Sequence, residues 1–82
     1  MRAVYELVIG IAKYLFAEGK TCTFDELAKM INDVSFKSYY SGGRGIAKVV
    51  AEVFKYAAEK YGPEIADIIA RVFTNKYGGK AY

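Results

Sequence analysis

The chain has 82 residues, 54% of them hydrophobic, and a net charge of +3 from 12 basic and 9 acidic side chains. This length fits one domain over residues 1–82 that buries only about 60% of its unfolded surface, so the core must be dense or shared with a partner. The single cysteine excludes an intrachain disulfide and predicts a cytoplasmic protein, and no apolar run approaches the ~20 residues that span a bilayer. Histidine and glutamine are absent while lysine, arginine and glutamate are frequent, a composition typical of a thermophile.

Helical spacing of apolar residues predicts the first helix near residues 3–18, with Gly19 as its left-handed stop. Two adjoining stripes of this segment are apolar: Val4, Leu7, Val8, Ile11 and Leu15 in one, and Tyr5, Ile9, Ala12 and Phe16 in the other. Because the two stripes together cover much of the helix, we expect most of it to be buried.

The second helix is predicted near residues 24–32, where the start signal is the clearest in the sequence. Thr23 followed by Glu26 forms a capping box, in which the threonine hydroxyl accepts from an amide of the first turn and the glutamate reaches back. Cys22 and Leu27 stand where a hydrophobic staple would pack.

The remaining elements complete an all-α pattern. Residues 34–41 alternate in polarity as a short strand does, but a serine-capped helical turn fits them equally well. Two longer helices are predicted near residues 45–61 and 64–75, separated by Gly62 as a left-handed cap and Pro63 as a helix start. The sequence therefore predicts a compact all-α domain of four helices.

Four residues are candidates for a contact between copies of the chain: Ala66, Ala70, Tyr77 and Tyr82. The two alanines lie on one side of the last predicted helix, where small side chains permit close approach by a neighbour. Tyrosine is enriched at subunit interfaces because its ring can be buried while its hydroxyl keeps a partner. We therefore expect a homo-oligomer.

The charge is placed unevenly along the chain. Residues 1–33 carry four basic and five acidic side chains, whereas residues 34–82 carry eight basic and four acidic ones. Two stretches of the second half contain basic residues and no acid: Lys37, Arg44 and Lys48 in residues 34–51, and Arg71, Lys76 and Lys80 in residues 68–82. Such asymmetry attracts polyanions, although ordinary solvated surfaces produce the same pattern.

The segment TFDELAKMINDVS resembles the first half of the helix-turn-helix signature of DNA-binding domains, as in a small archaeal or thermophile protein. The resemblance covers residues 21–38 and rests on six positions: Glu26, Leu27, Ala28, Ile31, Val34 and Ser35. It implies a homodimer bound to double-stranded DNA, or to RNA, with Ser38 or Tyr39 near the bases and Lys37, Arg44 and Lys48 on phosphates. In an alternative register, residues 46–61 are the second helix of the motif.

The stretch SGGRG, residues 41–45, permits two interpretations. Its amides and Arg44 could bind a phosphate at the start of the following helix, or its glycines could serve only as a hinge between helices. The stretch matches neither the dinucleotide fingerprint nor the P-loop, so no nucleotide cofactor and no small-molecule substrate is expected.

The sequence gives little support to catalysis. Cys22 near a helix start could have a lowered pKa, but the chain has no histidine to act as its base and lacks the usual metal ligands. Tyr56 and Lys60 match the Tyr-x-x-x-Lys pair of short-chain dehydrogenases, whose dinucleotide fold is several times larger than this chain. We expect no enzyme, no cofactor and no metal. The alternative to DNA binding is a self-assembling structural protein, such as a coat or filament subunit.

Overall fold

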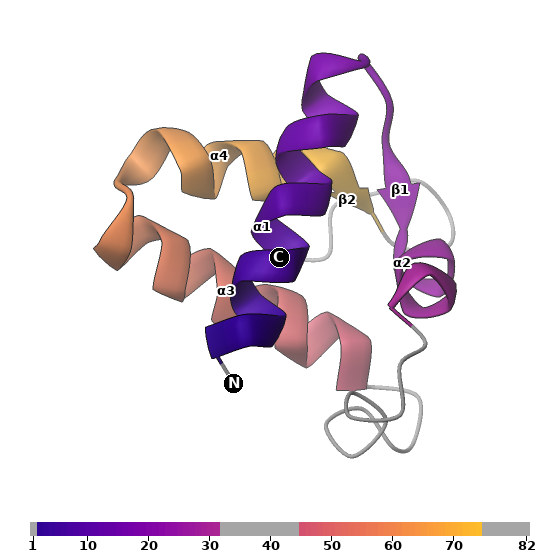
Figure 1. Ribbon diagram of the computed structural model, residues 1–82, viewed down its shortest axis with the longest axis horizontal. Helices are drawn as coiled ribbons and strands as arrows, with labels where there is room; N and C mark the ends of the chain where they lie inside the picture. Colours follow the sequence, from indigo (N-terminus) through magenta and orange to yellow (C-terminus); the bar gives the residue numbers. More distant parts are fainter. Residues whose placement is uncertain (1, 32–44, 75–82) are drawn as a thin grey trace.

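Four helices form the body of the protein in the computed structural model, which describes residues 2–31 and 45–74. They are α1 (Arg2–Ala17), α2 (Phe24–Met30), α3 (Gly45–Lys60) and α4 (Pro63–Val72) (Figure 1). The prediction of an all-α domain of four helices is confirmed. Residues 34–41, predicted as a strand or a helical turn, lie outside the described part of the chain. None of the described helices has both the length and the apolar character needed to cross a membrane.

A two-residue parallel strand pair joins the early and late parts of this body. β1 (Cys22–Thr23) pairs with β2 (Phe73–Thr74), with Cys22 opposite Phe73 and Thr23 opposite Thr74. The last helix therefore ends at Val72 and not near residue 75 as predicted, because Phe73 takes an extended backbone conformation (φ −94°, ψ 129°). In this position the Phe73 side chain is completely buried, which favours the strand over another helical turn.

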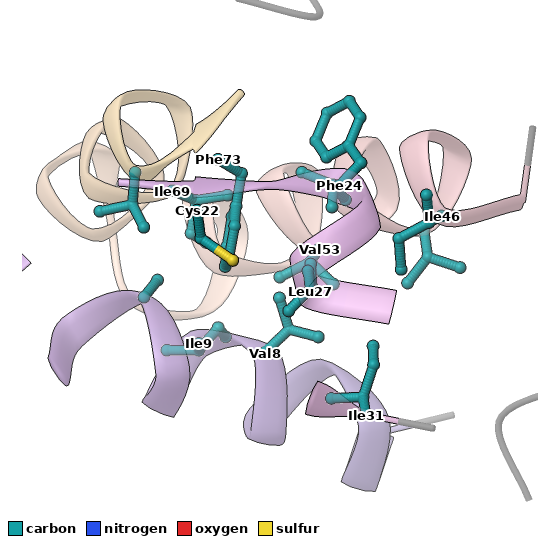
Figure 2. Close-up of a cluster of buried hydrophobic side chains, with 14 of the residues drawn as sticks. Val8, Ile9, Cys22, Phe24, Leu27, Ile31, Ile46, Val53, Ile69 and Phe73 are labelled. Carbon is teal, nitrogen blue, oxygen red and sulfur yellow. The ribbon is translucent and has the colours of Figure 1, made fainter. Parts of the chain in front are cut away.

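The core lies between the helices and beneath the strand pair. α1 contributes Val8, Ile9, Ala12 and Leu15, all buried. Figure 2 shows side chains of α1 gathered with residues of α2, α3, α4 and both strands in one apolar cluster. The core is therefore shared by every described element.

The expectation that both apolar stripes of α1 are buried is wrong for two residues. Leu7 is 49% exposed and Phe16 is 50% exposed. For Leu7 the reason is geometric, since α3 and α4 pack against one side of α1 and leave the side that carries Leu7 uncovered (Figure 1).

The helix ends form as the sequence predicts at two glycines. Gly19 has a φ of 67°, and the amides of Gly19 and Lys20 donate to the carbonyls of Phe16 (3.1 Å) and Leu15 (2.9 Å), as in a Schellman motif. Gly62 has a φ of 100°, and Pro63 begins α4 directly after it. Both turns rest on backbone conformations that glycine adopts without a steric penalty.

The start of α2 confirms the predicted capping box. The Glu26 amide donates to Thr23 Oγ1 (3.1 Å), and the Thr23 amide donates to Glu26 Oε1 (2.9 Å). The pKa of the Glu26 carboxyl group is lowered first by the hydrogen bond from the Thr23 amide and then by the Thr23 side chain. Cys22 and Leu27 are both buried beside this cap, as the predicted staple requires.

Replacing Thr23 with alanine should therefore lower the free energy of unfolding by about 0.5–2 kcal/mol, the usual cost of losing such a cap. Urea unfolding followed by circular dichroism measures this change. The matched control is Thr21→Ala, an exposed threonine two residues earlier, which should change the free energy of unfolding by less than about 0.5 kcal/mol. Equal losses in the two variants would contradict the role assigned to the cap.

Candidate functional site

Lys48 is the one residue of the predicted nucleic-acid contact that lies in the described part of the chain. Lys37, Ser38, Tyr39 and Arg44 all lie outside it. The Lys48 side chain is exposed in the first turn of α3, a turn that contains no acidic residue. Its ammonium makes no hydrogen bond or ion pair with residues 2–31 or 45–74. Within the described part of the chain, the Lys48 ammonium is therefore unpaired.

The charge of the chain divides sharply between two parts. Residues 2–31 and 45–74 contain eight of the 12 basic and eight of the nine acidic side chains, so this body carries no net charge. The remaining charged side chains lie in segments 32–44 and 75–82: Lys37, Arg44, Lys76 and Lys80 against Asp33 alone. The whole net charge of +3 therefore resides in these two segments.

Both basic segments leave the body beside α2. Ile31, the C-cap of α2, precedes segment 32–44. Thr74, which precedes segment 75–82, pairs with Thr23, the N-cap of the same helix. α2 has seven residues, so these two attachment points are separated by about 10 Å of helix and one strand spacing of about 5 Å. Figure 1 shows α2, β1 and β2 together at one side of the molecule.

Arg71 does not add to this basic character. Its Nε donates to Asp67 Oδ2 at 2.7 Å, an ion pair between successive turns of α4. Lys48 and Glu52, and likewise Lys55 and Glu59, are also four residues apart on α3, but neither pair forms an ion pair among the described residues. Glu52 instead accepts a hydrogen bond from the Tyr5 hydroxyl (2.8 Å).

A polar cluster between α1 and the end of α3 was not foreseen from the sequence. Glu6 accepts hydrogen bonds from the hydroxyls of Tyr56 and Tyr61, both at 2.6 Å, and from Lys60 Nζ at 3.3 Å. We call these four residues the Glu6 cluster. Hydrogen bonding, first from Tyr56 and then from Tyr61, lowers the pKa of Glu6 to about 2. The carboxylate in turn raises the pKa of Tyr61, so this tyrosine retains its proton.

The Glu6 cluster brings together the Tyr56–Lys60 pair that resembles a dehydrogenase motif. Lys60 Nζ donates to the Tyr56 hydroxyl at 3.0 Å, and the hydrogen bonds to Tyr56 and Glu6 raise the pKa of Lys60. The Tyr56 hydroxyl in turn donates to Glu6 Oε2. An open pocket of about 450 Å³ adjoins this pair, lined by Tyr5, Tyr56, Glu59 and Lys60. The hydrogen bonds of the Glu6 cluster thus form a polar link between α1 and the end of α3.

Cys22 differs from the sequence-based expectation. The side chain is 3% exposed, and burial, with a smaller contribution from the charge of Glu26, raises the pKa of the thiol to about 11. A thiol that keeps its proton at neutral pH is a poor nucleophile. Among the described residues, no three of the His, Cys, Asp and Glu side chains lie close enough to hold a metal ion.

Two of the four residues predicted at a contact between copies, Ala66 and Ala70, lie in the described part of the chain, on α4. Ala66 is 3% exposed within a single chain, where α4 packs against α1 and α3, so its methyl group has almost no surface to offer a second copy. Ala70 is half-buried. Tyr77 and Tyr82 lie outside the described residues. The close neighbour that Ala66 permits is within the same chain.

The main features of the described surface are the exposed Lys48, the attachment points of the two basic segments and the Glu6 cluster. Comparison of the chain with protein-family models, with curated proteins and with solved structures finds no match.

Proposed function

We propose that this protein binds nucleic acid, as a homodimer with a helix-turn-helix-like contact to duplex DNA, through the basic segments 32–44 and 75–82 and through Lys48. The observation that carries this proposal is the confinement of the entire net charge to two segments that leave the body near the two ends of one short helix, segment 32–44 from its C-terminus and segment 75–82 from β2 beside its N-cap. Such clustering of cations favours binding to a polyanion such as nucleic acid.

The composition of the two segments supports the same partner. They contain four of the eight tyrosines and four of the eight glycines, mixed with the four unbalanced cations. Tyrosine rings stack on exposed bases, and glycine allows a backbone to approach a phosphate closely. Ser38 and Tyr39 remain the residues proposed to approach bases.

The start of α3 adds a second source of positive potential. The first amides of a helix carry the positive end of its dipole, and no acid in the first turn of α3 neutralises it. Arg44 directly precedes this helix, and Lys48 lies within its first turn. We place a backbone phosphate here, in agreement with the first of the two interpretations of SGGRG.

Three double variants test the proposal, each removing two positive charges: K37A/R44A, K76A/K80A, and the control K20A/K55A from the exposed surface of the body. Binding to a 20-bp DNA duplex is measured by fluorescence anisotropy from 50 to 300 mM salt. Wild-type protein should bind with micromolar or tighter affinity at 50 mM salt. Each of the first two variants should reduce the slope of log K against log salt by about 2, because each lost phosphate contact removes about one unit.

The control should keep the wild-type slope. No binding at 50 mM salt, or equal losses in all three variants, would refute the proposed contact. Parallel titrations with a single strand of the same sequence and with duplex RNA identify which nucleic acid is preferred. Circular dichroism verifies that each variant is folded.

A self-assembling structural protein is the second candidate, and one observation favours it. α1 has an exposed apolar side that includes Leu7 and Tyr14, which are 49% and 61% exposed. Static light scattering without nucleic acid separates the two functions. A coat or filament subunit should form particles much larger than a dimer, whereas a DNA-binding protein should remain a dimer.

A further inference from the structure

The exposed side of α1 is a continuous apolar surface. Five residues form it, and all five are exposed: Ala3, Leu7, Gly10, Tyr14 and Ala17. They recur at alternating intervals of four and three residues, so they lie along one line of the helix. We call this line the outer α1 face. It contains no charged residue over the 16-residue length of the helix.

The outer α1 face lies away from the core. Val8, Ile9, Ala12 and Leu15 are buried on the other side of α1, against the remaining elements. In Figure 1 α1 crosses in front of α3 and α4. Exposed apolar surface in a continuous stripe commonly marks an interaction site.

Small and large side chains alternate along the outer α1 face. Leu7 and Tyr14 project from it, whereas Ala3, Gly10 and Ala17 leave depressions between them. Gly10 is fully open, because a Cβ atom placed there would meet no atom within 4 Å. A partner that fills this surface must therefore present small residues opposite the large ones and large residues opposite the small ones.

We propose that the outer α1 face binds the same face of a second copy in antiparallel orientation. One register satisfies the steric requirement for four of the five residues: Tyr14 lies opposite Ala3 of the second copy, and Leu7 lies opposite Gly10 of the second copy. The two-fold axis repeats both contacts. A parallel arrangement would instead place Tyr14 against Tyr14 and Gly10 against Gly10, with no complementarity.

The charges along the edge of this face support the same arrangement. Glu6 and Lys13 are seven residues apart on one edge, and in an antiparallel helix pair each edge meets the same edge of its partner. In the proposed register Glu6 comes within about 3 Å, along the axis, of the level of Lys13 in the second copy. The two-fold axis then brings two pairs of opposite charge to similar levels, beside the existing contacts of Glu6 with Lys60 (3.3 Å) and of Lys13 Nζ with the centre of the Tyr61 ring (5.6 Å).

The size of the contact predicts a weak association. α1 has 16 residues and is about 24 Å long, so a single helix pair lies at the lower end of the range of specific interfaces. We expect a dissociation constant in the micromolar range, measurable by sedimentation equilibrium at 5–500 μM protein without nucleic acid, a range set around such weak contacts.

Two lysine substitutions and a matched control test the proposed face. Leu7→Lys and Tyr14→Lys should each raise the dimer dissociation constant at least about tenfold, since each buries a charge in the contact. The control is Phe16→Lys, which replaces a 50% exposed aromatic residue of the same helix. Phe16 is two residues from Tyr14 and thus about 200° away around the helix, so this variant should dimerise as wild type does.

Gly10→Leu separates association from folding. The added side chain enters open space in one chain, and leucine favours a helix more than glycine does, so the free energy of unfolding of the monomer should not fall. The same side chain fills the depression that receives Leu7 of the second copy, so dimerisation should be lost.

A monomer at 500 μM, or loss of the dimer in Phe16→Lys to the same extent as in Tyr14→Lys, would overturn the proposal. If the chain's own segment 75–82 covers the outer α1 face instead, wild type stays monomeric and deleting that segment produces the dimer, which also refutes the arrangement for the intact chain. The measurement contains no DNA, so its result is independent of the nucleic-acid proposal.

Discussion

Replacing Phe73 with alanine is expected to lower the free energy of unfolding by about 3–5 kcal/mol. Phe73 is 0% exposed and heads the largest fully buried side chains of the described body. Its truncation removes apolar contacts to several elements and leaves a cavity beside β1 (Figure 2). Because small domains have a total stability of about 5–15 kcal/mol, this variant should be substantially unfolded at elevated temperature. Chemical denaturation at 25 °C measures the loss.

The matched control for this prediction is Phe16→Ala. It removes the same side chain from a position that is half exposed, so the loss should be about 1 kcal/mol or less. Losses of similar size at the two positions would show that Phe73 does not occupy the core as described.

Replacing Glu6 with glutamine is expected to change how stability depends on pH. Hydrogen bonds from Tyr56 and Tyr61 and from Lys60 lower the pKa of Glu6 to about 2 in the folded protein, from an ordinary value of 4.5. A lowered folded pKa means that the stabilisation is fully present above pH 4.5 and is lost as the pH falls toward 2. Wild type should therefore lose stability steeply in this window, and Glu6→Gln should be less stable at pH 7 and less dependent on pH below 4.5.

Denaturation midpoints between pH 2 and 7 test this expectation. The pKa of Glu26 is also lowered, by the capping box, so some acid sensitivity should remain in Glu6→Gln. Glu18→Gln is the control, since Glu18 is exposed and its side chain makes no hydrogen bond or ion pair with the described residues. A wild-type acid profile in Glu6→Gln would exclude the carboxylate as the centre of the cluster.

Local signals in the sequence predict the helices well. Each glycine stop, the proline start and the capping box act within a few residues, so they can be recognised without knowledge of the rest of the chain. α1, α3 and the start of α2 therefore lie within two residues of their predicted bounds. The start of α4 is likewise fixed by Gly62 and Pro63.

Features that depend on distant parts of the chain could not be predicted in the same way. β1 and β2 have only two residues each, too few for an alternating pattern, and their pairing depends on how α4 returns to α2. The Glu6 cluster joins residues 50 to 55 positions apart. The available signal was a single acid within the apolar N-terminal segment, and its partners become apparent only once α3 is placed.

The exposure of Leu7 illustrates a further limit of periodicity. Both stripes of α1 are apolar, so the spacing shows which residues share a side but not which side the rest of the protein covers. That choice depends on the directions of α3 and α4. Ala66, expected at a contact between copies because it is small, is likewise buried within a single chain.

The pairing of Cys22 with Phe73 also has a consequence for biosynthesis. These residues are 51 positions apart, so the last strand reaches its place only after nearly all of the body has been translated and has left the ribosome. Until then the core lacks Phe73, one of its largest fully buried side chains. We expect chains truncated before Phe73 to engage chaperones. Chains that extend a few residues past Thr74 should instead complete the core rapidly once they leave the ribosome.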